Sequence, residues 1–342
     1  MLKGRNAIWI IAGVEKIRQK SCGNLPANVT YGAKYGILFA VQIIRICPVF
    51  AICAAQCCAR EAEAAGGDFV NTWIKSLLPL GVAAVVTGGL HILSAATRDR
   101  CVEYTETAVT SPKLPTACEG YKIAFLTDIH AASPEFLRGI VQELNRRQID
   151  LLLLGGDFLY KKNGAQRALQ ILSHVRTRDG IWGVRGNHDR QNGLFDAMRR
   201  LGMHPLRNSG TLLPNGIYLA GVDDWRTSWP DADRALAGAG SEHLTILLSH
   251  NPDAAMQPSA RKADIVLCGH THGGQVTLFG LWAPSLTLTR HITSYGQKFR
   301  GGWTQTPLSS HVFVSRGIGS HSGIPRIFAR PQVVCLQLHR PT

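Results

Sequence analysis

The stretch Ile265-Val-Leu-Cys-Gly-His-Thr-His272 places two histidines directly after a short apolar run. Histidine is the commonest metal ligand in proteins, and four other stretches repeat the plan of an apolar run followed by polar side chains. These stretches are Asp128/His130, Gly156-Asp157, Gly186-Asn187-His188-Asp189 and Ser249-His250. Together the five supply two carboxylates, one amide and four imidazoles as ligands, with one further histidine, and we therefore predict a two-metal site.

The apolar runs predict buried strands because each is short and almost free of polar residues. They cover residues 123–126, 151–154, 181–184, 244–248 and 265–267. Three helices are expected between them, one beginning at Ser133-Pro134 and two others at 165–175 and 194–201. Strands that alternate with helices favour an α/β fold with a mainly parallel core. Loops at the C-terminal ends of such strands meet on one edge, which would bring the polar stretches together.

The order Asp-x-His, Gly-Asp, Gly-Asn-His-Asp, His and Gly-His-x-His resembles that of the calcineurin-like metallophosphoesterases. The resemblance covers roughly residues 121–338, and the alternative is a set of polar residues scattered at strand ends. It implies a four-layer α-β-β-α sandwich whose catalytic domain occupies residues 121–342. It also implies metal-dependent hydrolysis, so the expected partner is a phosphoester substrate.

The resemblance gives the polar side chains roles at two divalent metal ions. Mixed imidazole and carboxylate ligands suit Mn, Zn or Fe, whereas Mg and Ca prefer sites made of oxygen. One ion would be held by Asp128, His130 and His272, the other by Asn187, His250 and His270, and both by a bridging Asp157.

Two cations about 3.5–4 Å apart lower the pKa of a bridging water and stabilise the attacking and leaving oxygens of an in-line displacement. His188 is left over once the ligands are assigned. The resemblance implies that it protonates the leaving group, with Asp189 orienting it; the alternative is a structural histidine. In the protein-phosphatase branch, Asp and Arg occupy the positions of Tyr160 and Lys161, so protein-phosphatase activity is not expected.

The sequence that precedes the catalytic domain is apolar. Residues 77–93 contain no Asp, Glu, Lys or Arg, and we therefore expect a transmembrane anchor at residues 70–97. Residues 98–120, which include Pro112 and Pro115, are expected to form an extended linker between the anchor and the domain.

A second apolar stretch, residues 35–59, precedes the anchor within an N-terminal extension of residues 1–69. Arg45 and Pro48 interrupt it, so it either spans the membrane or lies along the membrane surface. Basic residues near the start favour a cytoplasmic N-terminus; two spans would return the enzyme to the cytoplasm and one would place it outside. We predict a protein anchored in a bacterial inner membrane, with the side left open.

The formal net charge of the chain is +14. A basic surface suits anionic membranes or nucleic acid, or is merely solvated. The sequence has no helix-turn-helix or zinc-finger pattern, so we expect a membrane surface rather than nucleic acid as partner. The nine cysteines do not form the spacing of a disulfide framework.

Within the family the chain most resembles membrane-anchored bacterial phosphodiesterases. The likeness rests on the apolar segment, the Pro-containing linker, the Gly-His-Thr-His-Gly-Gly-Gln run at 269–275 and the closing Arg316-Gly317-Ile318-Gly319. One related branch is the UDP-2,3-diacylglucosamine pyrophosphatase of lipid A biosynthesis. The loop 223–230, with Trp225, Arg226 and Trp229, would then bind substrate, unless it is only a packed loop.

We therefore predict hydrolysis of a phosphodiester or pyrophosphate bond in a membrane-associated substrate such as a UDP-diacylglucosamine-like lipid precursor. The nearer alternative is a broad phosphodiesterase or nuclease that acts on soluble substrates. The farther alternative is a metal-bound membrane scaffold without catalytic activity.

Overall fold

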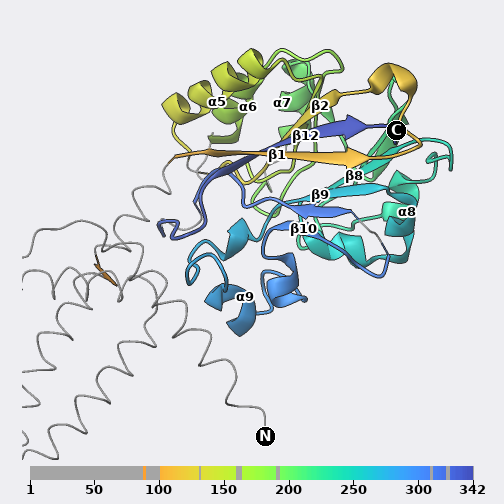
Figure 1. Ribbon diagram of the computed structural model, residues 1–342. Helices are drawn as coiled ribbons and strands as arrows, with labels where there is room; N and C mark the ends of the chain where they lie inside the picture. The colour runs from red at the N-terminus through yellow and green to blue at the C-terminus, as the bar shows by residue number, and fades with distance from the viewer. Residues whose placement is uncertain are drawn as a thin grey trace, which may run out of the picture. The chain divides into compact units, whose positions relative to one another are not determined.

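Two six-stranded sheets form the centre of the catalytic domain in a computed structural model of the chain (Figure 1). The structure describes residues 88–89, 101–130, 132–158, 164–189, 193–308, 311–320 and 324–341. The predicted apolar span at 35–59 lies outside these residues, as does the anchor at 70–97 apart from Gly88 and Gly89. Within the described residues, no helix has the length and apolar character needed to cross a membrane.

The first sheet contains the three predicted strands that come earliest in the chain. Its order is β1 (Glu103–Thr110), β12 (Gln332–His339), β2 (Tyr121–Leu126), β3 (Leu151–Leu154), β4 (Ile181–Gly183) and β5 (His204–Pro205). Strands β2 to β5 are parallel, and β12 is antiparallel to β2. The core of this sheet is therefore parallel, as the strand-and-helix alternation predicts.

The second sheet contains the remaining two predicted strands. Its order is β10 (Gly302–Thr304), β11 (Val312–Val314), β9 (Ile265–Cys268), β8 (Thr245–Ser249), β7 (Tyr218–Gly221) and β6 (Ser209–Leu212). The central strands β11, β9, β8 and β7 are parallel, and the two edge strands are antiparallel to their neighbours. Both sheets are thus mixed, with parallel central strands as predicted and antiparallel pairings toward their edges.

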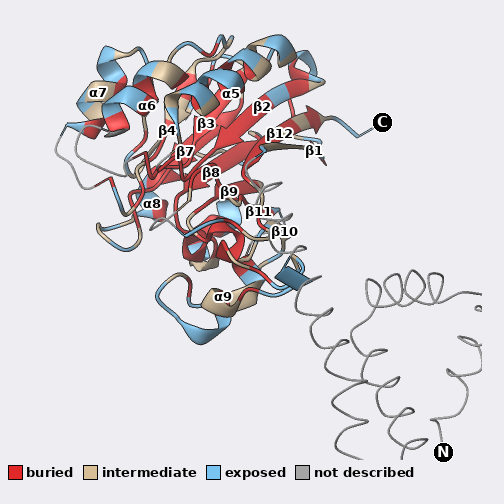
Figure 2. Ribbon diagram, turned by 90° about the vertical axis from the view of Figure 1, so that its left-hand side faces the viewer, coloured by how far each residue is buried: buried red, intermediate tan, exposed pale blue. Residues whose placement is uncertain are grey.

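Side chains on the two faces of a strand enter different cores, because successive residues point to opposite sides. In β3, Leu151 and Leu153 face the core between the sheets, whereas Leu152 and Leu154 face the core under the helices. This burial on both faces explains why the strand is a continuous apolar run. Figure 2 shows the buried strands between their covering layers.

Three helices cover the outer face of the first sheet, as the sequence predicts: α5 (Pro134–Arg147), α6 (Gly164–Leu172) and α7 (Leu194–Arg200). Helix α5 begins where expected, because the Ser133 hydroxyl accepts a hydrogen bond from the backbone N–H of Phe136 at 3.2 Å. Its side chains Leu137, Ile140 and Leu144 recur at helical spacing and are buried.

The outer face of the second sheet is covered differently. Its cover includes α8 (Ala232–Ala235) and the 3-10 turns η2 (Pro252–Met256) and η3 (Pro258–Lys262), none longer than five residues. Small side chains such as Ala254, Ala255 and Ala263 fill this core, so the covering backbone packs close to the sheet. The predicted four-layer α-β-β-α sandwich thus has short turns in place of long helices in its fourth layer.

The structure corrects the predicted linker at 98–120. Residues 103–110 of that segment form β1, which pairs in parallel with β12 along its whole length (Figure 1). Val109 of β1 is buried in the core between the sheets, and Leu114 and Cys118 after it are buried there too. A linker would not bury these side chains, so the folded domain begins before the predicted boundary at 121.

Candidate dinuclear metal centre

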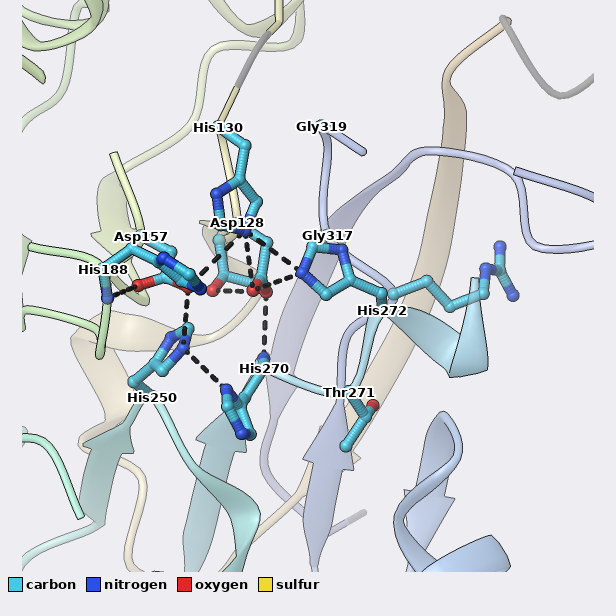
Figure 3. A network of polar contacts seen from close by, with 12 residues as sticks. Asp128, His130, Asp157, His188, His250, His270, Thr271, His272, Gly317 and Gly319 are labelled. Atoms are coloured by element: carbon cyan, nitrogen blue, oxygen red, sulfur yellow. Dashed lines mark hydrogen bonds and ion pairs between the residues drawn. The ribbon is translucent and has the colours of Figure 1, made fainter. Parts of the chain in front are cut away.

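The polar stretches predicted to bind metal converge from both sheets (Figure 3). Asp128 follows β2, Asp157 follows β3 and Asn187 follows β4 in the first sheet. His250 and His270 follow β8 and β9 in the second sheet. Because the two sheets pack face to face, these strand ends lie beside one another, and all seven predicted ligands belong to one connected cluster.

Asp128, His130 and His272 form one group of potential ligands, and all three are buried. The Nε2 atoms of His130 and His272 lie 3.1 Å apart. Oδ1 of Asp128 lies 3.8 Å from Nε2 of His130 and 3.3 Å from Nε2 of His272. This is the set to which the family resemblance gives the first metal.

Asp157, His250 and His270 form the second group. Nε2 of His250 lies 3.2 Å from Oδ2 of Asp157 and 3.1 Å from Nδ1 of His270. Oδ1 of Asn187 lies 3.1 Å from the same His250 nitrogen, so the predicted amide ligand joins this group. Oδ2 of Asp157 also lies 3.5 Å from Nε2 of His130 in the first group. Asp157 is therefore the carboxylate that lies between the two groups.

A buried oxygen indicates that these residues suit a cation. Oδ1 of Asp128 is buried and has no hydrogen-bond partner, although its other oxygen accepts from the Thr127 hydroxyl at 2.9 Å and the His270 N–H at 3.0 Å. Burying an unsatisfied carboxylate oxygen is costly. A divalent cation would satisfy that oxygen, and imidazole and carboxylate ligands together suit transition metals.

Charges within the cluster shift several pKa values. Burial alone would lower the pKa of His250, but the Asp157 carboxylate outweighs it and raises that pKa to about 10. Burial works against the charged form of Asp157 too, yet His250 and His130 hold the pKa of Asp157 well below its usual range. Burial and the charge of His250 lower the pKa of His270 to about 3, which leaves a neutral imidazole able to bind metal.

Backbone strain is concentrated at the ligands. Left-handed backbone conformations are uncommon outside glycine and cost of order 1–3 kcal/mol each. Five predicted ligands adopt them, with φ between 40° and 69°: Asp128, His130, Asp157, His270 and His272.

Asp189 holds together two of the loops that carry predicted ligands. It is fully buried, and its carboxylate accepts hydrogen bonds from the backbone N–H groups of Asp157 at 2.7 Å, Phe158 at 2.9 Å and Gly186 at 2.9 Å. Burial, and then the negative charge of Asp157, raises the pKa of Asp189 to about 7. The side chain thus connects the loops after β3 and β4.

His188 differs from the ligands because it is exposed to solvent. Its backbone N–H donates to Oδ1 of Asp157 at 2.8 Å, and its ring lies edge-on to that of His130, with centroids 5.2 Å apart (Figure 3). It lines a cleft of about 600 Å³ together with Asp157, Asn187, His270 and His272. The cleft therefore gives access to the cluster from the solvent.

The loop 223–230 contributes only one of its three singled-out residues to this cleft. Arg226 lines the cleft, whereas Trp225 packs against the core on the outer face of the second sheet. Trp229 lines a separate hollow with Asn208 and Pro258. Gly274 and Gln275, which the sequence places near the metals, do line the cleft.

Two supporting residues carry no clear signal in the sequence. Arg326 is buried, and its guanidinium donates to the backbone oxygens of Arg316 at 2.8 Å and His272 at 3.3 Å, beside Nδ1 of His272 at 3.2 Å. It therefore fixes the loop after β9 to the segment after β11. A lone arginine in an irregular segment gives no periodic pattern, and only its isolation among apolar residues could have drawn attention.

Gly317 belongs to the stretch Arg316-Gly317-Ile318-Gly319, whose role the sequence indicates only through resemblance to the family. Its φ is 71°, and a Cβ atom added to it would lie 2.5 Å from Cβ of Asp128. The next two residues form hydrogen bonds with the loop after β2. The Ile318 N–H donates to the Thr127 carbonyl at 3.0 Å, and the Gly319 N–H donates to the Asp128 carbonyl at 2.7 Å. Gly317 thus lets the closing segment pack directly against a predicted ligand (Figure 3).

Comparison with known proteins agrees with this geometry. Residues 121–274 match the family of calcineurin-like phosphoesterases, a stretch that contains every predicted ligand. The chain therefore contains a calcineurin-like metallophosphoesterase domain, and its relatives identify it as a metal-dependent phosphoesterase, a hydrolase.

Three similar proteins show how far the likeness extends. The uncharacterized metallophosphoesterase YkuE of Bacillus subtilis is 28% identical over 273 residues, which cover 76% of this chain and 93% of YkuE. A transmembrane protein with metallophosphoesterase domain from Danio rerio is 28% identical over 302 residues, covering 81% of this chain and 65% of that protein. The phosphodiesterase YaeI of Escherichia coli is 28% identical over 242 residues, covering 64% of this chain and 82% of YaeI.

Proposed function

We propose that this enzyme hydrolyses a phosphodiester or pyrophosphate bond at a pair of divalent metal ions. The observation that carries the proposal is the position of Asp157, whose Oδ2 lies 3.5 Å from a nitrogen of one ligand group and 3.2 Å from a nitrogen of the other. A carboxylate placed in this way can bridge two cations. The first ion is held by Asp128, His130 and His272, and the second by Asn187, His250 and His270.

The metals in this proposal are Mn, Zn or Fe, because the ligands combine imidazole nitrogens with carboxylate oxygens. When bound, such a pair supplies Lewis acidity to the phosphoryl group and makes water a stronger nucleophile near neutral pH. The protein holds the ligands in fixed positions through strained backbone and buried hydrogen bonds. That preorganisation supports reaction without a rearrangement of the loops.

His188 is the proposed general acid. Its exposed side chain lines the cleft, and its backbone N–H is fixed to Oδ1 of Asp157, so the ring borders both the cluster and the substrate space. In this role it donates a proton to the oxygen of the departing group. Asp189 is a positioning residue, because its carboxylate accepts from the backbone N–H groups of Asp157 and Gly186 and so joins the loops after β3 and β4.

The cleft supports a diester or pyrophosphate rather than a small monoester. Its volume of about 600 Å³ exceeds what a phosphoryl group needs, and its lining combines Arg226 with apolar Val276, Ile292 and Ile324. A cation and apolar surface together suit a phosphate that carries an apolar substituent. The relative YaeI is named a phosphodiesterase, which favours the same reaction class.

The proposed substrate is associated with a membrane, such as a UDP-diacylglucosamine-like precursor of lipid A. Support comes from the charge-free apolar residues 77–93, which predict a bacterial inner-membrane anchor, and from the net charge of +14. A relative from Danio rerio is named a transmembrane protein, which is consistent with this location. A soluble diester is the alternative substrate for the same chemistry.

The test is turnover by the full chain in detergent with added Mn²⁺. Three substrates are compared: bis(p-nitrophenyl) phosphate, p-nitrophenyl phosphate and UDP-2,3-diacylglucosamine, with Asp157→Ala as the blank. Preference for the acylated substrate supports the membrane proposal, and activity on the simple diester alone supports a broad phosphodiesterase. Equal or better turnover of the monoester would contradict the diester proposal, and metal-independent turnover would contradict the dinuclear mechanism.

A further inference from the structure

A group of large apolar side chains is exposed around the segment that follows the last metal ligand. We call Leu278, Phe279, Leu281, Trp282, Leu288 and Ile324 the apolar rim. Leu281 and Leu288 are 78% and 77% exposed, and Phe279 is 65% exposed. Single exposed apolar residues are ordinary, but several in one segment mark a surface that binds another apolar phase.

The rim is held by a fixed scaffold. Leu278 and Trp282 form an antiparallel bridge, so Phe279, Gly280 and Leu281 form the tip of a hairpin. The Arg300 guanidinium donates to the carbonyl of Gly280 and closes this tip.

Further contacts fasten the base of the hairpin to its neighbours. The amide of Gln297 donates to the Ala283 carbonyl at 2.6 Å and accepts from the Ala283 N–H at 3.2 Å. Val276, which lies just before the hairpin, forms a parallel bridge with Ile327. Ile327 belongs to the same segment as Ile324. The apolar tip is therefore presented outward rather than free to fold back.

The rim borders the mouth of the active-site cleft. Ile324 belongs to the rim and also lines the cleft. Pro284 and Ser285, which begin helix α9 (Pro284–Leu288), line the cleft as well, and Leu288 ends the same helix. A surface that covered the rim would lie at the entrance used by the substrate.

Charge distinguishes the partners that the rim could bind. No Asp or Glu occurs after Asp264, so the whole segment that builds the rim is free of carboxylates. Exposed Arg290 and Lys298 lie within it. Two copies of this chain joined through their rims would bring these like charges together, whereas an anionic surface would attract them.

We propose that the apolar rim docks the catalytic domain onto an anionic phospholipid bilayer, with Leu281 and Leu288 in the interfacial layer and the cleft mouth facing the head groups. Apolar side chains next to basic ones bind at the membrane interface by burial of apolar area together with attraction to anionic lipids. The inference rests on the proposed function at a membrane, because it explains how a tethered domain would reach a substrate in the bilayer.

The experiment measures hydrogen exchange of the full chain in nanodiscs that hold one chain per disc and, in a second series, two chains per disc. Discs of phosphatidylcholine alone are compared with discs that also contain phosphatidylglycerol, so that the predicted anchor is present in both. The double variant Leu281→Asp/Leu288→Asp tests the rim. The matched control is Leu212→Asp/Trp229→Asp, which changes two exposed apolar side chains outside the rim.

We expect backbone amides of residues 276–289 to exchange roughly tenfold more slowly in the anionic discs, where basic side chains gain attraction to lipid. The rim variant should lose this protection, and the control variant should keep it. Equal exchange in both kinds of disc, or protection that the rim variant retains, would overturn the proposal. Protection that depends on the number of chains per disc instead of on the lipid would assign the rim to self-association and overturn it as well.

Turnover of bis(p-nitrophenyl) phosphate by the same samples separates this inference from the proposed function. Lipid-dependent protection without turnover would uphold docking and count against the catalytic proposal. Turnover without lipid-dependent protection would support the catalytic proposal and count against docking.

Discussion

At the scale of single residues, the predicted ligands are read easily from sequence because their types and order carry the chemistry. The residues that hold these ligands in place are much harder to recognise in the sequence. Arg326 and Gly317 act through contacts with His272 and Asp128, residues that lie 54 and 189 positions away in the chain, and no local pattern announces such contacts. The sequence therefore predicts what binds metal better than what holds the ligands in place.

The proposed role of His188 can be tested through the leaving group. We expect His188→Ala to lower kcat by about 10²–10⁴-fold, as for other general acids, while bound metal stays unchanged. The loss should be smaller for p-nitrophenyl esters than for alkyl esters, because a good leaving group needs no proton. Steady-state kinetics with both ester types and elemental analysis measure this. His174→Ala, at an exposed histidine two residues after the end of α6, is the control. An equal loss for both ester types would instead indicate a structural role.

Gly317 should matter to metal binding for a steric reason. A methyl group there would crowd Asp128, so we expect Gly317→Ala to weaken metal affinity by roughly 10–100-fold, as losses next to metal ligands do. Gly202→Ala is the matched control, because Gly202 has φ of 73° and nothing within 4 Å of an added Cβ. Both variants should be destabilised by about 1–2 kcal/mol through their backbone conformation. Metal titration followed by calorimetry separates the two effects, and similar affinities in both variants would contradict the crowding argument.

At the scale of secondary-structure elements, local signals predict what is locally determined. Helix α5 has a capping serine, a proline at its first position and a buried stripe, and the structure confirms it. Strand β1 lacks such signals, because only Val109 among its eight residues is buried. Its place in the sheet depends on pairing with β12, more than two hundred residues later, which neither propensity nor pattern reveals.

Val109 offers a test of β1 as part of the domain. We expect Val109→Ala to lower the free energy of unfolding by about 1–3 kcal/mol, because it removes buried methyl groups from the core between the sheets. Thr110→Ala, at the exposed neighbouring position of the same strand, should change stability by less than about 0.5 kcal/mol. Urea unfolding of both variants gives the comparison. If residues 103–110 belonged to a linker, the two variants would have the same free energy of unfolding.

A buried carboxylate at the end of β7 connects the two sheets. Asp223 accepts hydrogen bonds from Arg185, which follows β4, at 2.9 Å to its Oδ2 and from Arg207 at 2.8 Å. Burial opposes the charged form, but these arginines outweigh it and hold the pKa of Asp223 below its usual range. The folded-state pKa thus lies below that of the unfolded chain. The pairing stabilises the fold above about pH 4 and is lost as pH falls through the folded-state value.

Asp223→Asn should therefore destabilise the protein at pH 7 by about 1–3 kcal/mol, since it leaves Arg185 without its charged partner. The difference from the parent protein should shrink as pH is lowered below about 4, where the parent loses the same interaction. Denaturant unfolding between pH 7 and pH 2 measures this. Asp196→Asn, whose carboxylate pairs with Arg199 in an exposed position, should show little difference at any pH. A constant difference for Asp223→Asn across the range would refute the linkage.

At the scale of the whole molecule, the candidate centre joins the two sheets. Asp128, Asp157 and Asn187 follow strands of the first sheet, and His250 and His270 follow strands of the second. Elsewhere between the sheets, a core of apolar side chains and polar contacts such as that of Asp223 with Arg185 join the two layers. Ions bound to this cluster would thus cross-link the two halves of the domain, and they would offset both the strained backbone at five ligands and the unsatisfied Asp128 oxygen.

Removal of metal should accordingly lower the stability of the entire domain and not only its activity. A ligand that binds only the folded state stabilises it by about 2.7 kcal/mol at one hundred times its Kd, so Tm should rise steadily with Mn²⁺ concentration and fall on addition of a chelator. Asp157→Asn removes the carboxylate between the two ligand groups, and its Tm should respond far less to Mn²⁺. Glu143→Gln, on the outer helix α5, should respond as the parent does. Differential scanning calorimetry across a Mn²⁺ series makes the comparison. A Tm that is insensitive to metal while activity still requires it would mean that the ions bind to a centre already held by the protein alone, and the cross-linking argument would fail.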